Sequence, residues 1–432
     1  MKRIGGTVVG AVLVVSSLVT GCSSNQGSSG SSNGKIVLNM AWWGDDSRAQ
    51  VTEQAVKDFE KIHANIQVNV SYSGWNGYWQ KITTELSGGN GPDVMQQDVS
   101  TLSSYAQRGA LLSLSKNAID TSSISSAALD SGVINGNLYA IPAGIEGVTM
   151  FYNPSLLQKA GVTITQNEQL TWTQYAKIAN QVTQKVKGVY GTPDLSGDEV
   201  AFQFYLRENG ENEYTASGKL GFDKQTFENW LNYWASLRKS GAAPPASFTA
   251  SQANVAEAQS AFATGKTPFS FDFTGDTDFN DYESYLKESL GMMMVPSVAG
   301  GKEGNYPRPT MYWSVNSQSK YPKQAEELVN FLENSLTAGK DLGLSRGLPV
   351  SSKVAAALHK TLPKNQDTAW NATQAELKVA TPMSPLEPAA GTQVSTLFTN
   401  ITQENEFGKL SATQAADQFF TQADQILKNA NN

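Results

Sequence analysis

Apolar residues follow two spacings along the chain, one typical of strands and one typical of helices. The segment 35–40 is rich in branched apolar residues and predicts a first strand. Apolar residues then recur at helical spacing from Val51 to Ile62. A strand at 67–72, a helix at 78–86 and a strand at 93–98 follow. This order predicts an α/β domain with a largely parallel sheet.

The alternation continues to the end of the chain. We expect further strands at 138–142, 149–153, 268–273, 290–295 and 312–316, and helices from a Thr171 cap to Val186 and at 227–237, 323–333 and 412–427. Trp172, Trp230 and Trp234 lie at or in these helices, so we interpret them as core residues. The length of 432 residues fits two or three domains, or one large domain with two lobes.

The first residues predict an export signal. Lys2 and Arg3 precede an apolar stretch, Thr7 to Val19, which is too short for a spanning helix. It runs into Leu18-Val19-Thr20-Gly21-Cys22, which resembles a bacterial lipobox. The resemblance implies a signal peptide at 1–21 and a palmitate-type lipid on Cys22, anchoring the chain to the outer face of the cytoplasmic membrane. An ordinary signal peptide with an incidental cysteine is the alternative.

Residues 22–34 are dominated by Ser and Gly and predict a flexible tether behind the lipid anchor. The body of the chain then begins near Lys35. No later apolar run is long enough to span a membrane.

The composition excludes several functions. The chain has one cysteine and two histidines, His63 and His359, which argues against a disulfide framework and most metal sites. The formal net charge is −7 without a Lys/Arg run in the body, so we expect no nucleic-acid partner. No dinucleotide, phosphate-loop or nucleophile-elbow motif is complete, and we expect no cofactor. A catalytic site built on a pair of carboxylates is not excluded, because Asp and Glu are abundant.

Aromatic and polar residues gather where strands should end. Trp42 and Trp43 end the first strand, Trp75 follows the second, and Trp313 lies in a late strand. Ligands of α/β proteins collect outside the carboxyl ends of strands, and sugar rings offer flat faces that stack on indole. A tryptophan is more often a core residue than a ligand platform, so the hypothesis rests on several such sets at separate strand ends.

Polar residues accompany these tryptophans. Gln97 and Asp98 follow a strand, Glu146 follows another, and Asp272 and Asp276 bracket Phe273-Thr274-Gly275. Amides and carboxylates at such positions suit the hydroxyl groups of a carbohydrate.

Several ordered motifs resemble the extracellular solute-binding proteins of carbohydrate ABC importers, the group that includes maltodextrin-binding protein. The motifs are Gly91-Pro92-Asp93-Val94-Met95 with residues 105–112, Leu138-Tyr139-Ala140-Ile141-Pro142 with Phe151-Tyr152-Asn153-Pro154, residues 170–175, and residues 261–267. The resemblance covers nearly all of the chain behind the signal.

The resemblance implies an α/β fold of two lobes, each a mainly parallel sheet flanked by helices, with crossovers between them. Lobe 1 would hold 35–143 and about 290–345, and lobe 2 would hold 144–289 and about 346–432. Arg346-Gly347-Leu348-Pro349 resembles a loop beside the later hinge, where Arg346 bonds a ligand or forms a salt bridge between lobes. The expected ligand-binding residues are Trp42, Trp43, Trp75, Gln97, Asp98, Glu146, Asp272, Phe273, Asp276, Trp313 and Arg346.

The function implied is that of a binding component, not an enzyme. The chain would be a monomer that captures an oligosaccharide between its lobes and delivers it intact to the membrane permease of an ABC importer. An extracellular carbohydrate-active hydrolase with a carboxylate pair is the alternative, and a receptor for a non-sugar solute is a third. The family often has Trp at the second-lobe ligand loop, whereas this chain has Phe273, Thr274 and Gly275.

Overall fold

The computed structural model describes residues 35–430 except 45, 116–117, 254, 275–277, 364–365, 386 and 389. Cys22, the signal and the tether lie outside the described residues. Residues 36–432 form one compact unit. Within the described part, no helix has the length and apolar character needed to cross a membrane.

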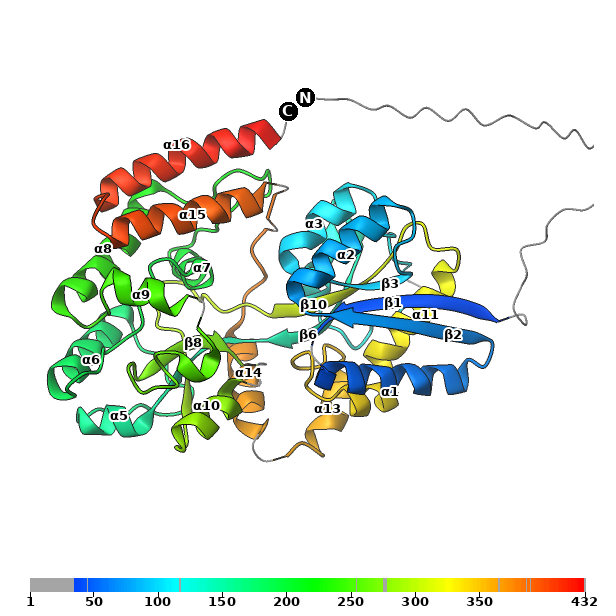
Figure 1. The fold of residues 1–432 in the computed structure, drawn as a ribbon, viewed down its shortest axis with the longest axis horizontal. Helices are drawn as coiled ribbons and strands as arrows, with labels where there is room; N and C mark the ends of the chain where they lie inside the picture. The colour runs from blue at the N-terminus through cyan, green and yellow to red at the C-terminus, as the bar shows by residue number, and fades with distance from the viewer. Residues whose placement is uncertain are drawn as a thin grey trace, which may run out of the picture. The chain divides into compact units, whose positions relative to one another are not determined.

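A five-stranded sheet forms the first half of the fold. Its strand order is β2 (Ile66–Ser73), β1 (Ile36–Trp43), β3 (Val94–Gln97), β10 (Arg308–Val315) and β6 (Ile141–Glu146) (Figure 1). β1 is parallel to both β2 and β3, as expected from the helical connections between them. β10 is antiparallel to both of its neighbours. β1, β2, β3 and β6 therefore share one direction and β10 runs against them, so the sheet is mixed but mainly parallel, as expected.

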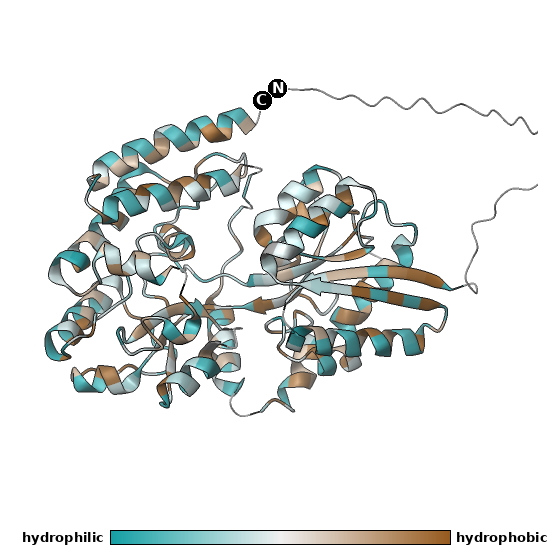
Figure 2. Ribbon diagram, viewed as in Figure 1, coloured by the Kyte–Doolittle hydropathy of each residue, from teal (hydrophilic) through white to brown (hydrophobic). Residues whose placement is uncertain are grey.

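Apolar patterning explains the layers around this sheet. β1 buries its second half completely, up to Trp43. The helix α1 (Asp46–Ile62) buries one face through residues such as Ala55 and Phe59. Figure 2 shows the contrast, with brown stretches on the strands and alternating teal and brown on the long helices.

A three-stranded sheet forms the second half. β7 (Val148–Tyr152) lies between β8 (Phe269–Phe273) and β9 (Gly291–Met294), and both pairings are antiparallel. The expectation of a mainly parallel second sheet was therefore wrong. The pattern of apolar residues predicts that a segment forms a strand. It does not predict the direction of that strand, which depends on the long connections between strands.

A single residue, Gly147, joins β6 of the first sheet to β7 of the second. Its backbone N–H donates to Thr274 Oγ1 at 2.8 Å. A Cβ at this position would lie 1.8 Å from Glu376 Oε2, so a side chain has no room here. The crossover is thereby held close to the end of both β6 and β8.

The helices complete the two halves. They are α2 (Trp75–Ser87), α3 (Val99–Gln107), α4 (Ser126–Asp130), α5 (Pro154–Lys159), α6 (Trp172–Lys185), α7 (Glu199–Glu208), α8 (Lys224–Ser240), α9 (Ala246–Gln252), α10 (Asp278–Leu286), α11 (Pro322–Asn334), α12 (Leu336–Leu342), α13 (Ser352–His359), α14 (Asp367–Val379), α15 (Gly391–Glu406) and α16 (Ala412–Ala430). A 3₁₀ turn at Glu257–Gln259 and a small hairpin of β4 (Val133–Ile134) and β5 (Asn137–Leu138) are also present.

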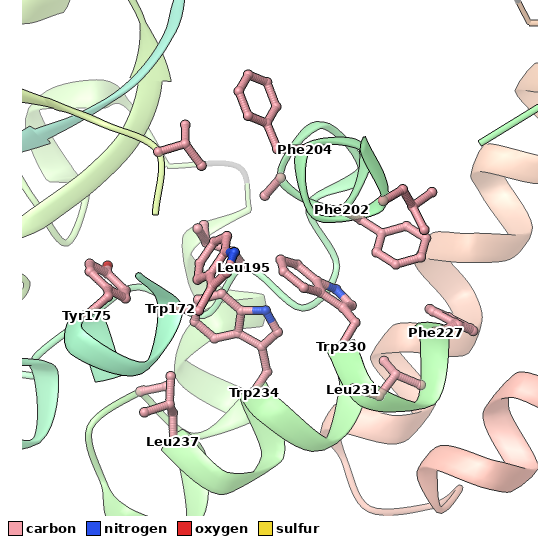
Figure 3. Close-up of a cluster of buried hydrophobic side chains, with 14 of the residues drawn as sticks. Trp172, Tyr175, Leu195, Phe202, Phe204, Phe227, Trp230, Leu231, Trp234 and Leu237 are labelled. Atoms are coloured by element: carbon pink, nitrogen blue, oxygen red, sulfur yellow. The ribbon is translucent and has the colours of Figure 1, made fainter. Parts of the chain in front are cut away.

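Each sheet has its own core. The core of the second sheet contains Trp172, Trp230 and Trp234, whose rings meet edge to face (Figure 3). Their assignment as core residues is confirmed by their burial. The core of the first sheet includes Phe59 and Trp313 and extends to Val350.

The expected lobe boundaries differ from these cores at two places. β9 pairs with β7, so residues 291–294 belong with the second sheet and not with lobe 1. α13 packs on α11 and α12 of the first half, although the sequence placed it in lobe 2. Both segments come just before the chain crosses to the other half, and a crossover has no composition signal of its own.

Candidate functional site

The strand ends of both sheets meet at a pocket of about 250 Å³, which we call the arginine pocket. Trp43 ends β1, Glu146 ends β6, Phe273 ends β8 and Arg308 begins β10. Arg346, in the segment after α12, completes this part of the wall, and the other lining residues are Arg48, Thr310, Met311, Ser345 and Gly347. Four residues expected from the sequence therefore lie together: Trp43, Glu146, Phe273 and Arg346.

An ion pair lies in the wall of this pocket. Glu146 and Arg308 face each other across β6 and β10, and Arg308 Nη1 donates to Glu146 Oε1. The Arg308 guanidinium also lies over the Phe273 ring, 4.4 Å from its centroid. Arg308 thus links the first sheet to the end of the second. A partly buried pair of this kind presents both donors and acceptors to a ligand.

Arg346 is buried and forms no ion pair within the part of the chain that the structure describes. It is 4% exposed, and its Nε donates to Gln96 Oε1 at 3.1 Å. Its guanidinium lies 4.8 Å from the Trp313 ring centroid, while Nη1 and Nη2 have no hydrogen-bond partner among the described residues. Burial, and then repulsion from Arg48, lowers the pKa of Arg346 to about 9. The salt bridge considered as an alternative role for Arg346 does not form between described residues.

Three aromatic side chains pack against Trp43. The Trp75 and Trp43 rings meet edge to face at 4.9 Å, and Tyr78 and Trp79 also pack on Trp43. Trp75 is 44% exposed, whereas Trp43 is nearly buried and lines the pocket. The indole of Trp43 is thereby fixed in orientation, as a stacking surface for a ring requires.

A second pocket, of about 140 Å³, shares Arg308 with the first, and we call it the acidic pocket. Its carboxylates are Asp98, Glu199, Glu213 and Glu387. Burial, and then the charge of Glu199, raises the pKa of Glu213 well above its ordinary value and that of Glu387 to about 7. Protonated acids at neutral pH donate as well as accept hydrogen bonds, which suits hydroxyl groups.

Three expected ligand residues are core residues in the structure. Trp42, Gln97 and Trp313 have no exposed surface, and none of them lines the arginine pocket. The Trp42 and Tyr72 rings stack with their centroids 5.8 Å apart, and the Trp313 ring packs against the Arg346 guanidinium. Alternation along a strand places every second residue on the covered face, and the expectation that these side chains contact a ligand stays a prediction.

Two of the acidic residues expected at the site accept hydrogen bonds from nearby backbone N–H groups. Asp98 caps α3 by accepting from Ser100 N at 2.9 Å, although it also lines the acidic pocket. Asp272 accepts from Ser270 Oγ and Phe273 N within its own strand. Asp276 lies outside the described residues.

The sequence interpretation missed Arg308, Glu199, Glu213 and Glu387. Arg308 lies in Tyr306-Pro307-Arg308-Pro309, and its place beside Glu146 depends on β10 running antiparallel. Glu199 begins α7, an element for which no helix was expected. In the described part of the chain, no group of three or more His, Cys, Asp or Glu side chains is arranged to hold a metal ion.

Comparison with known proteins identifies the family. Residues 45–335 match the family described as bacterial extracellular solute-binding protein. A maltooligosaccharide ABC transporter solute-binding lipoprotein of Streptococcus pneumoniae is 23% identical over 75% of both chains, and an arabinooligosaccharide-binding protein of Bacillus subtilis is 22% identical over 79% of both.

Solved structures of similar proteins match the same family. An extracellular solute-binding protein of family 1 from Alicyclobacillus acidocaldarius is 36% identical, covers 92% of this chain and all of its own, and superposes with a TM-score of 0.74. The two-lobed α/β fold class is thereby confirmed. The relatives are binding proteins rather than enzymes, and none of them supports the hydrolase alternative. The chain belongs to the family of bacterial extracellular solute-binding proteins.

Proposed function

We propose that the chain is the substrate-binding component of an ABC importer that captures an oligosaccharide. The observation that carries the proposal is the arginine pocket, where the ends of β1, β6 and β8 bring Trp43, the Glu146–Arg308 pair and Phe273 together. An aromatic surface beside paired polar groups is the combination that a sugar ring needs. The names of the maltooligosaccharide and arabinooligosaccharide relatives support this ligand class.

The mechanism requires binding energy but no bond breaking. The two sheets are joined at Gly147, where a small backbone rotation changes the distance between their ends. A sugar that contacts Glu146 on one side and Phe273 on the other stabilises the state in which both contacts form. A permease subunit then recognises that closed state, with the chain acting as a monomer.

We further propose that Cys22 carries lipid and that residues 22–34 are a tether to the outer face of the cytoplasmic membrane. The Ser/Gly-rich composition of the tether and the position of the one cysteine support this arrangement. Labelled palmitate should enter the wild-type chain in cells and should be absent from Cys22→Ser. Equal labelling of both chains contradicts the anchor.

The binding proposal is tested by titration calorimetry of residues 23–432 with a panel of neutral and acidic oligosaccharides. We expect one class to bind reversibly. Trp43→Ala should weaken that binding at least about fivefold, because an aromatic stacking surface contributes about 1 kcal/mol or more in a desolvated site.

Trp79→Ala is the matched control, because Trp79 packs behind Trp43 and does not line the arginine pocket. Its effect on affinity should be smaller than that of Trp43→Ala, with both variants folded by circular dichroism. No binding by any glycan in the panel, or equal affinity of wild type and Trp43→Ala, contradicts the proposed site.

A further inference from the structure

The arginine pocket carries more positive than negative charge. Its lining contains the guanidinium groups of Arg48, Arg308 and Arg346 against one carboxylate, that of Glu146. The chain as a whole is acidic, with 39 Asp and Glu against 32 Lys and Arg. An excess of arginine at the meeting point of the strand ends is therefore a local feature of the site and does not follow from composition.

Arg308 and Arg48 have protein partners. Arg308 pairs with Glu146, as described above. Arg48 donates through Nε to Ser345 O at 3.0 Å and through Nη1 to Trp43 O at 3.3 Å. These contacts hold both side chains in the pocket wall, whereas the terminal nitrogens of Arg346 have no hydrogen-bond partner among the described residues.

Arg346 has both terminal nitrogens unsatisfied. Nη1 and Nη2 are buried without a hydrogen-bond partner among the described residues, although Nε is bonded to Gln96. A buried cation of this kind destabilises the fold unless an anion or hydrogen-bond acceptors compensate it. Glu333 is the nearby acid that attracts Arg346, but burial raises the pKa of Glu333 to about 8, so it is mostly protonated at neutral pH.

The chemistry that fits is a planar anion. Two terminal guanidinium nitrogens match the two oxygens of a carboxylate in a bidentate pair, whereas a hydroxyl group leaves the positive charge uncompensated. Trp43 and Phe273 line the same pocket and offer apolar surface to a ring that carries the anion. Gln96 and the Trp313 ring fix the guanidinium in place.

We propose that Arg346 binds the carboxylate of an acidic sugar unit, so that the captured oligosaccharide contains a uronate. This inference rests on the proposed function and specifies its ligand class. The Glu146–Arg308 pair and the acidic pocket next to it then contact hydroxyl groups of the same or the neighbouring unit.

The test uses pairs of glycans that differ in one group. Calorimetry of residues 23–432 compares uronate-containing oligosaccharides with the same chains after reduction of the carboxyl group to a primary alcohol. We expect the acidic form to bind about 10- to 100-fold more tightly, the range of a charge-assisted bidentate contact. The preference should shrink as salt is added. This comparison uses wild type only and needs no variant to fold.

Variants then assign the preference to one residue. Arg346→Gln should bring the acidic and reduced glycans to similar affinities, and Arg346→Lys should keep part of the preference. Arg108→Gln is the matched control, because Arg108 is exposed at the end of α3 and does not line the arginine pocket. It should keep the wild-type preference.

The outcomes separate this inference from the proposed function. Tight binding of a neutral oligosaccharide, with no gain from a carboxylate, overturns the inference and leaves the oligosaccharide receptor intact. A stronger preference for a sulfated glycan than for a uronate also overturns it. An acid preference that survives unchanged in Arg346→Gln overturns the role of Arg346. Absence of binding by every glycan overturns the proposed function itself.

Discussion

At the scale of single residues, neighbouring tryptophans with the same sequence context differ in how deeply their side chains are buried. Trp43 and Trp42 are neighbours at the end of β1, yet Trp43 lines the arginine pocket and Trp42 has no exposed surface. Trp313 supports Arg346 from within the core. The sequence correctly placed tryptophans near strand ends, but which face each one occupies follows from the neighbouring strands and helices.

Burial predicts unequal losses of stability when tryptophans are truncated. Trp313→Ala should lower the free energy of unfolding by about 3–5 kcal/mol, because it removes a fully buried indole from the first core. Trp75→Ala is the control, since Trp75 is 44% exposed, and its effect should stay below about 1 kcal/mol. Urea unfolding measures both. A loss below about 1 kcal/mol in Trp313→Ala would mean that Trp313 is not a core residue.

Buried acids predict how stability depends on pH. Glu208 accepts from Trp172 Nε1 at 2.9 Å and from Val298 N at 3.0 Å, and burial nevertheless raises its pKa to about 8. A carboxyl group whose pKa is higher in the folded state adds stability below its unfolded pKa, near 4.3. That stability is lost as the pH rises to about 8.

Glu208→Gln should therefore flatten the decline of unfolding free energy between pH 5 and pH 8. Asp424→Asn, an exposed change on α16, should keep the wild-type slope. Urea unfolding at several pH values provides the measurement. A wild-type slope in Glu208→Gln would show that this carboxyl group does not bind the extra proton.

At the scale of elements, local signals located helices and strands but not strand directions. Apolar spacing predicted β1, α1, β2 and α16 within a few residues, because each buries one face. The antiparallel course of β10 and β9 was missed, since direction depends on contacts distant in sequence. The position of Arg308 in the candidate site was missed for the same reason.

The start of α6 offers a test at this scale. Thr171 was expected to cap the helix, and its side chain accepts from Gln174 N at 3.2 Å while Gln174 Oε1 accepts from Thr171 N. Thr171→Ala should lower the free energy of unfolding by about 1 kcal/mol. Thr173→Ala, two residues further along the same exposed turn, should have little effect or be slightly stabilising. If Thr173→Ala costs as much, the loss does not come from the cap.

At the scale of the whole molecule, the fold explains why a binding site forms where it does. The strand ends of two sheets with separate cores meet at the Gly147 crossover, and the arginine pocket takes residues from both. As a member of an extracellular family, the chain works outside the cytoplasm. A receptor there must hold its solute firmly enough to collect it and then release it unchanged.

The most direct test of the account is recovery of the ligand after binding. Residues 23–432 are incubated with the glycan of the panel that binds most tightly and are then separated from unbound sugar. The protein is denatured, and the mass of the released sugar is measured by mass spectrometry. The account predicts one sugar per chain with the mass of the starting glycan, even after long incubation. Recovery of shorter products, or of no sugar from a folded chain, would contradict it.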